Sequence, residues 1–348
     1  MILSAIPSPR STAVQVAPSK RHSWRSPTAT TEAGPVPKTR VSGVVRPGRG
    51  TLRGVVPQLA KRSLRRAIAA PGIRHGLRWF LQQPGIPAGW RALAHRKLAK
   101  RAWFGDRTFR YTTPEGVELE LLHGGTSSYL YWLGEYERET TSLFCARAAA
   151  AEVILDVGAA DGLYAILAAA ANPRARILAF EPGGGAAEVC RRNFARNRPT
   201  TDRIELRQVA LGASDGEATL YVAGETGGTS SLDPAFRADR REERVQVRGG
   251  DSLLAELGVA RVELVKLDTE STEPAVLRGL AGTLRRDHPD VICEVLYGRT
   301  EQALAEVMGP LGYQFYWISG EGLVRHDAIA GDPTYRYPNY LFTTRTVA

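Results

Sequence analysis

From about residue 106 onward, short apolar runs alternate with longer stretches in which apolar residues recur every three or four positions. The apolar runs predict strands at 152–156, 176–181, 204–210, 217–222, 262–268 and 290–296. The longer stretches predict helices at 135–150, 162–171, 185–197, 273–285 and 300–311. Strands and helices that alternate at this spacing predict an α/β fold, in which a mostly parallel sheet carries helices on both faces.

Two antiparallel features flank this alternating region. The segment RTFRYTTPEGVELEL, at 107–121, predicts a hairpin with its turn at Pro114–Gly116. Near the other end, YQFYWIS and NYLFTTR predict a closing pair of strands. We therefore expect residues 106–348 to form one α/β domain.

The preceding 105 residues have a different composition. Residues 1–50 are rich in Ser, Pro, Thr, Arg and Gly, which predicts a disordered tail because too little apolar surface can be buried to offset the entropy of ordering. Residues 51–105 add Leu, Ile, Trp and Phe to a basic background. This pattern predicts short amphipathic helices interrupted at Pro71, Pro84 and Pro87.

The net charge of +10 is divided unevenly along the chain. Residues 1–105 hold 20 Lys and Arg against one acid, Glu32, whereas the remainder holds 26 Lys and Arg against 35 acids. Three interpretations of the basic segment stay open. It is a solvated tail whose helices pack on the main domain, a peripheral site for an anionic membrane surface or another polyanion, or else a transit peptide or the result of a start codon assigned too early.

The remaining composition bears on the compartment. No run approaches the roughly 18 apolar residues that a membrane span needs. The three cysteines, at 145, 190 and 293, have no paired spacing, which disfavours a disulfide framework or a zinc site. We therefore expect a cytoplasmic protein, with peripheral membrane contact through residues 1–105 as an open possibility.

The stretch VILDVGAADGLYAILAAAANPRARILAFEP, at 153–182, predicts a nucleotide-type ligand site. The first strand ends in Asp156 and a turn follows through Gly158, Ala159 and Gly162, while the second strand ends in Glu181 and Pro182. Glycine allows the ligand to approach the backbone, and a carboxylate at the second strand tip can accept hydrogen bonds from both ribose hydroxyls.

The turn also indicates which ligand to expect. Ala160 stands where the dinucleotide fingerprint has its second glycine, the residue that makes room for a pyrophosphate. S-adenosylmethionine has no phosphate, and Asp156 suits its ammonium and sulfonium groups. A purely structural role for Asp156 at the start of the following helix is the alternative.

Together with DVGAADGLYA and AFEP, the motifs RRNFARN, VALGASDGEATLYV, GGTSSL, VKLDTESTEPAVLRG and NYLF resemble those of the FkbM-family methyltransferases. The resemblance covers about 125–345. It implies a class I methyltransferase (Rossmann-like) fold that uses S-adenosylmethionine, with O-methylation of a hydroxyl on a natural product, sugar or glycolipid. The chain departs from the family at Ser271 and Thr272, where the family commonly has Gly and Ala.

Further acids lie where other strands end. Ser214 and Asp215 follow the third strand and are expected at the adenine edge, or else simply in a hairpin turn. Asp268 and Glu294 end the fourth and fifth strands, so they are the predicted catalytic pair, which orients the acceptor hydroxyl and takes its proton. A divalent metal held by these carboxylates could lower the pKa of the hydroxyl instead, although we do not predict one.

Three other side chains are weaker candidates for a functional role. Glu273 precedes Pro274, as is ordinary at a helix start, and His326 is the candidate imidazole base. Asn339 precedes an apolar strand and either positions the substrate or belongs to a turn.

Other functions fit the residues less well. An NAD-dependent dehydrogenase would need glycine at the position of Ala160. A nucleic-acid methyltransferase would need an aromatic–proline signature near the fourth strand, and KLDTEST lacks it. The alternative to an enzyme is a catalytically silent binding module with the same fold, which docks through its basic tail. We expect a small-molecule or glycan acceptor and no specific nucleic acid.

Overall fold

The structure is a computed structural model, and it describes residues 70–83, 85–97, 107–223, 229–235 and 240–347 of the chain. The predictions for residues 1–69, including the disordered tail, lie outside the described residues, as do Pro84, Gly227 and Gly228. The domain boundaries drawn from the sequence stay a prediction.

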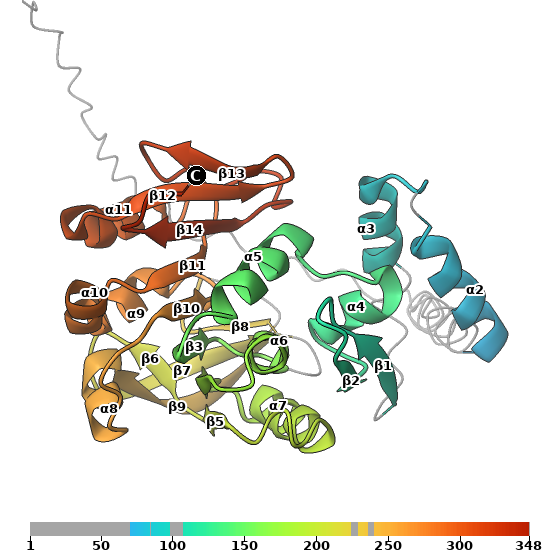
Figure 1. Ribbon diagram of the computed structural model, residues 1–348, viewed down its shortest axis with the longest axis horizontal. Coiled ribbons are helices and arrows are strands. Elements are labelled where there is room, and N and C mark those ends of the chain that lie inside the picture. The colour runs from blue at the N-terminus through green and yellow to red at the C-terminus, as the bar shows by residue number, and fades with distance from the viewer. Residues whose placement is uncertain (1–69, 84, 98–106, 224–228, 236–239, 348) are drawn as a thin grey trace, which may run out of the picture. The chain divides into compact units, whose positions relative to one another are not determined.

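An eight-stranded sheet forms the centre of the described region, with the order β13-β12-β14-β11-β10-β3-β4-β5 (Figure 1). Its strands are β3 (Val153–Val157), β4 (Arg176–Phe180), β5 (Ile204–Arg207), β10 (Leu264–Leu267), β11 (Asp290–Glu294), β12 (Gln314–Ser319), β13 (Gly322–His326) and β14 (Asn339–Thr343). The five strands from β11 to β5 are parallel, and β14 runs antiparallel to both of its neighbours. This arrangement confirms the predicted class I methyltransferase fold.

The strand order reverses between β3 and β10. From β3 the chain proceeds outward through β4 and β5, and from β10 it proceeds the other way through β11. A crevice therefore opens beyond the carboxyl ends of β3 and β10, the place where open α/β sheets bind their ligands.

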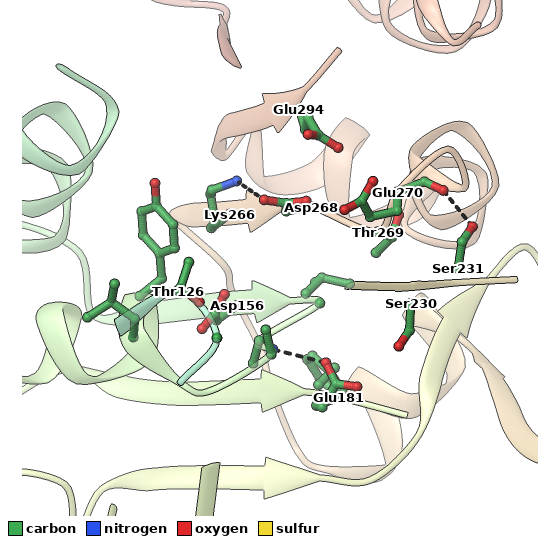
Figure 2. Close-up of a pocket in the computed structure, with 18 of the residues that line it drawn as sticks. Thr126, Asp156, Glu181, Ser230, Ser231, Lys266, Asp268, Thr269, Glu270 and Glu294 are labelled. Atoms are coloured by element: carbon green, nitrogen blue, oxygen red, sulfur yellow. Dashed lines mark hydrogen bonds and ion pairs between the residues drawn. The ribbon is translucent and has the colours of Figure 1, made fainter. Parts of the chain in front are cut away.

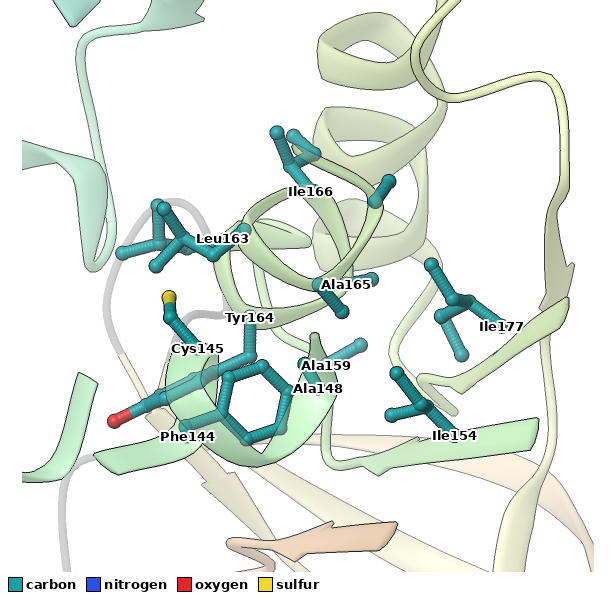
Figure 3. Close-up of a cluster of buried hydrophobic side chains, with 14 of the residues drawn as sticks. Phe144, Cys145, Ala148, Ile154, Ala159, Leu163, Tyr164, Ala165, Ile166 and Ile177 are labelled. Atoms are coloured by element: carbon teal, nitrogen blue, oxygen red, sulfur yellow. The ribbon is translucent and has the colours of Figure 1, made fainter. Parts of the chain in front are cut away.

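Both faces of the sheet are buried because successive strand residues belong to different cores. Ile154 and Ile177 pack under α5 (Arg138–Ala148) and α6 (Leu163–Ala171), in the cluster that Figure 3 shows around α6. Their neighbours Leu155 and Leu178 belong to the opposite core, under α9 (Glu273–Gly279) and α11 (Glu301–Met308). In Figure 1 the green helices and the orange helices accordingly lie on opposite sides of the central strands.

The remaining helices of the sheet region are α7 (Gly184–Arg196), α8 (Gly250–Glu256) and α10 (Ala281–Asp287). The predicted helix at 273–285 is two helices, α9 and α10, which meet at Leu280. Gly279 ends the first of them against the second sheet, where a Cβ would lie 1.9 Å from the carbonyl oxygen of Gly212.

A second sheet of four strands corrects the predicted single sheet. Its order is β6-β9-β7-β8, with β6 (Ala210–Gly212), β7 (Gly216–Ala223), β8 (Thr229–Ser231) and β9 (Arg241–Gly249). The strand predicted at 204–210 is therefore divided between the two sheets, and 217–222 lies in the second. The apolar side chains of β7 and β9 form a small core of their own with Leu220 and Val245, while Glu217 and Arg244 face solvent. One solvated face is typical of antiparallel sheets.

The described residues before α5 form two further units. The predicted hairpin is confirmed as β1 (Thr108–Thr112) and β2 (Glu118–Leu122), with its turn between them. Helices α2 (Pro71–Leu81) and α3 (Ala88–Lys97) pack against α4 (Ser127–Leu133), and Leu81 is fully buried in the first core. Among the described helices, none has the length and apolar character needed to cross a membrane.

Candidate active site

A cavity of about 810 Å³ opens at the carboxyl ends of the parallel strands. Asp156, Gly158 and Glu181 line it along β3 and β4, and Asp268 and Glu294 line it from β10 and β11 (Figure 2). The structure thus brings together the predicted ligand turn and the predicted catalytic pair. Ala159 and Pro182 also line the cavity, as expected.

The turn after β3 is fixed by its neighbours on both sides. The backbone N–H groups of Gly158 and Ala159 both donate to the carbonyl oxygen of Phe180, at 2.9 and 3.0 Å. Gly158 has a φ of +83°, and a Cβ there would lie 1.8 Å from the carbonyl oxygen of Asp268. Only glycine fits this turn while β10 keeps its place, because a side chain meets both a backbone clash and an unfavourable φ.

Glu181 holds the same turn from the tip of β4. Its Oε2 accepts a hydrogen bond from the Ala160 N–H at 2.9 Å, and its Oε1 accepts one from the Gly183 N–H at 2.8 Å. Burial raises the pKa of Glu181 to about 7, although both N–H donors act to lower it. A carboxylate offers about four acceptor positions, so Glu181 can accept two more hydrogen bonds.

Asp156 contacts the start of α6 and also lines the cavity. Its side chain lines the cavity, and its Oδ2 accepts from the Ala165 N–H at 2.9 Å, in the first turn of α6. Burial raises the pKa of Asp156 to about 7, while the Lys266 charge lowers it. The second oxygen, Oδ1, is the part of this carboxylate that a ligand could engage.

Three predicted ligand residues do not line the cavity. Asp215 Oδ1 accepts from the Gly249 N–H and pairs with Arg248, and Ser214 belongs to the same bend before β7. This is the turn that the sequence offered as the alternative. Gly162 begins α6 with a φ of +81°, and its missing side chain makes room for Phe194 and Cys190 of α7.

Apolar side chains, together called the apolar slot, line the cavity, whereas Ser214 and Asp215 do not. Its residues line the cavity beyond Glu181 and come from β4, β6, β7 and the segments beside them: Phe180, Pro182, Val209, Leu211 and Leu220. A flat apolar ring system suits such a lining, because pockets for small molecules are mostly apolar with few polar groups.

Where β10 reaches the cavity, Lys266 is fully buried at the end of the strand. Its Nζ donates to Asp268 Oδ2 and to Asn339 Oδ1, both at 3.3 Å, and lies 4.9 Å from the centre of the Tyr164 ring. Burial lowers the pKa of Lys266, but Asp268, Glu137 and other acids outweigh burial, so the pKa is raised overall. The side chain is therefore a fixed cation behind Asp268.

Glu137 completes this network from the segment before α5. Its Oε2 accepts from Tyr164 Oη at 2.8 Å and from Asn339 Nδ2 at 2.9 Å, so the amide of Asn339 joins Glu137 to Lys266. Burial raises the pKa of Glu137, with Lys266 opposing the change. The sequence analysis considered Asn339 as a positioning amide but missed Glu137, because residue 137 lies outside every strand tip.

Glu294 is the least satisfied acid of the cavity. It ends β11 opposite Asn339 of β14, and its Oε2 is buried with no hydrogen-bond partner among the described residues. Burial raises the pKa of Glu294 well above its usual range, and the nearby acids Asp268, Glu270 and Glu273 raise it further. Glu294 therefore keeps its proton to a higher pH than an ordinary glutamate does, and the protonated acid can donate a hydrogen bond.

The turn that follows Asp268 is strained. Glu270 and Ser271 have φ values of +55° and +97°, a region that favours glycine. Oε1 of Glu273 accepts from the N–H groups of Thr269 and Ser271, at 2.9 and 3.2 Å, and so holds the turn. The family departure at Ser271 thus falls on a position where glycine avoids strain, and the structural role considered for Glu273 accounts for its contacts.

Aromatic residues from the N-terminal part of the chain form a further wall. His95 of α3 lies with its ring 4.0 Å from the ring of Tyr129 in α4, and the rings of Tyr129 and Tyr136 are 5.3 Å apart. Burial raises the pKa of Tyr136 well above its usual range, with Glu137 and Asp268 as the nearest acidic contributors. The three rings line the same cavity as Asp268, and His123 also lines it.

Other candidates lie away from the cavity. His326 Nδ1 is 2.8 Å from Tyr340 Oη, and His326 does not line the cavity. Within the described ranges, no group of three His, Cys, Asp or Glu side chains is placed to hold a metal ion.

Comparison with known proteins shows similarity to methyltransferases. Residues 156–315 match the family model described as the methyltransferase FkbM domain. The chain is 31% identical over 154 residues to methyltransferase sdnD of Sordaria araneosa, covering 44% of this chain and 52% of that protein. It is 26% identical over 148 residues to the 2-O-methyltransferase NoeI of Sinorhizobium fredii, covering 38% and 59% respectively. The chain spans less than two thirds of each of these relatives.

Among solved structures, the chain is similar to methyltransferase FkbM from Methylobacillus flagellatus, with a TM-score of 0.39 and 13% identity over 63% of this chain and 52% of that one. The match of residues 156–315 to the FkbM methyltransferase model agrees with the resemblance that the sequence motifs indicated.

Proposed function

We propose that this chain, with its FkbM methyltransferase domain, transfers the methyl group of S-adenosylmethionine to a hydroxyl on a natural product, sugar or glycolipid. The observation that carries the proposal is a single cavity that holds both the glycine turn with Glu181 and the Lys266–Asp268 pair. A donor site and an acceptor site must share one cavity for a direct transfer.

The residues around the turn fit S-adenosylmethionine. Glu181 has two free acceptor positions for ribose hydroxyls, and the apolar slot with Phe180 and Leu211 suits an adenine. Asp156 supplies negative charge for the ammonium or the sulfonium. When bound, S-adenosylmethionine supplies a methyl group on a positively charged sulfur, which is open to attack by an oxygen.

Asp268 is the proposed base of the reaction. Lys266 holds its Oδ2 and stabilises its negative charge, while Oδ1 remains for the acceptor hydroxyl. As the oxygen–methyl bond forms and the sulfur–methyl bond breaks, the hydroxyl proton passes to Asp268. A positioned base contributes roughly 10²–10⁴-fold, and alignment of the reactants contributes up to about 7–11 kcal/mol.

Glu294 has a different proposed role from Asp268, although both end strands at the same edge. Its raised pKa favours the protonated acid, which cannot accept the hydroxyl proton. We therefore assign Glu294 to orient the acceptor by donating a hydrogen bond to a neighbouring oxygen. Its unpartnered Oε2 in the cavity wall supports this role.

The test is methyl transfer from S-adenosylmethionine labelled in its methyl group to fractions of a cell extract. We expect label in a small-molecule, glycan or lipid fraction, and about 10²–10⁴-fold slower labelling with Asp268→Asn. Glu188→Gln, at an exposed acid of α7, is the matched control and should label at the wild-type rate. Label in nucleic acid, or no label in any fraction while the donor still binds, would contradict the proposal.

A further inference from the structure

We propose that helices α2 and α3 form a docking surface for an anionic membrane. The observation that motivates this proposal is the distribution of large apolar side chains on the described surface. Ile73, Trp79 and Phe80 of α2 and Trp90 and Leu93 of α3 are exposed, whereas the rest of the described chain exposes only two such residues, Tyr297 and Tyr335.

Helix α2 is turned so that its bulkiest apolar residues face away from the protein. Ile73 and Phe80 are seven positions apart and share one side of the helix, and Trp79 lies on the same exposed arc with 66% of its surface accessible. Leu77 and Leu81 face the core instead. A helix that only covered the domain would place Trp and Phe inward, so this arrangement points to an apolar partner beyond the described residues.

Helix α3 repeats this arrangement. Trp90, which is 69% exposed, and Leu93 are three positions apart and face solvent. On the opposite side, Arg91 pairs with Glu135 and His95 reaches into the cavity wall. Helix α3 therefore has one face toward the candidate active site and one face available to a partner.

Charge decides which partner fits. Residues 33–105 contain 16 Lys and Arg and no Asp or Glu, so the segment that includes α2 and α3 is strongly basic. Trp, Phe and Leu beside Arg and Lys are typical of helices that lie in the headgroup region of a membrane. An anionic surface attracts each basic residue that lies near it, whereas a neutral apolar protein surface would gain nothing from this charge. We therefore assign the occupant as an anionic lipid surface.

The experiment is flotation of the full chain with phosphatidylcholine vesicles that contain phosphatidylglycerol, compared with phosphatidylcholine alone. We expect binding to the anionic vesicles that weakens in high salt, because screening reduces the attraction of the basic residues. Trp79→Ser and Trp90→Ser should each weaken binding by about tenfold, as expected for a side chain that is partly buried in the interface. Tyr297→Ser, at a 52% exposed aromatic outside α2 and α3, is the matched control and should bind as wild type.

Three results would overturn the proposal. Absence of vesicle binding excludes the membrane, and equal binding by the tryptophan variants places the contact elsewhere in the chain. Loss of a dimer in Trp79→Ser, measured by light scattering without vesicle binding, identifies a second copy as the occupant. Because flotation needs neither S-adenosylmethionine nor an acceptor, its outcome is independent of the proposed methyl transfer.

Discussion

Replacement of Gly158 by alanine tests whether the close approach of β10 dictates glycine in the turn after β3. A Cβ at residue 158 would lie 1.8 Å from the carbonyl oxygen of Asp268, and real Cβ contacts are essentially never shorter than 3.0 Å. The carbonyl would therefore have to move by at least 1.2 Å. Such a movement strains the hydrogen bond from the Asp268 N–H to the Val157 carbonyl oxygen, which measures 3.0 Å.

Gly116 provides a control with the same backbone conformation. Both glycines have a φ of +83°, but a Cβ at Gly116 would have no atom within 4 Å. Gly116→Ala therefore carries only the conformational cost, about 1–2 kcal/mol. Gly158→Ala adds the displacement of a buried strand end, and we expect a total loss of about 3–5 kcal/mol in the free energy of unfolding.

The assay is urea denaturation of wild type and both variants, followed by circular dichroism, with the slope of the transition checked for constancy. Gly158→Ala should unfold at a clearly lower urea concentration than Gly116→Ala. If the two variants lose the same stability, the contact with Asp268 is not the reason for glycine, and the reasoning fails.

Three further results are expected. Ser271→Gly should raise the free energy of unfolding by about 1 kcal/mol in the same assay, because glycine adopts a φ of +97° without strain; a loss of stability would contradict this. Asn339→Ala should lower the free energy of unfolding by about 2–3 kcal/mol, since Lys266 and Glu137 each lose a buried partner. A change within error would show that this hydrogen-bond network contributes little to stability. The pKa of Glu181 is about 7 in the folded chain against 4.5 as its ordinary value, so the folded state binds more protons between about pH 4.5 and 7 and stability without ligand should fall as pH rises through this window. Glu181→Gln should flatten that part of the pH profile, and an unchanged slope would assign the titration to other groups.

The meeting of four acids in one cavity could be predicted from the sequence because it depends on where the strands end. In a parallel sheet all carboxyl ends share one edge, so Asp156, Glu181, Asp268 and Glu294 had to meet once their strands were recognised. Ser214 and Asp215 show the limit of this reasoning. The strand before them divides between two sheets, and the bend carries both residues away from the cavity.

The positions of the aromatic wall residues and of Glu137 could not be predicted in the same way. The wall residues in question are His95, Tyr129 and Tyr136. These residues precede the sheet, and their positions depend on how α3 and α4 pack rather than on strand register. Glu137 has a φ of +41°, which no local pattern indicates. The exposure of the tryptophans of α2 and α3 could not be predicted from the sequence either, because an amphipathic pattern does not indicate which face of a helix is turned inward.

The central claim is that the turn at Gly158 and the carboxylate of Glu181 hold S-adenosylmethionine. Calorimetric titration of S-adenosylmethionine into wild type, Glu181→Gln and the exposed control Glu188→Gln tests it most directly. We predict binding by wild type and the control, and a Kd at least tenfold higher for Glu181→Gln, since hydrogen bonds to a charged group contribute about 1.5–3 kcal/mol. Wild-type affinity in Glu181→Gln, or no binding to the wild-type chain, would contradict the account.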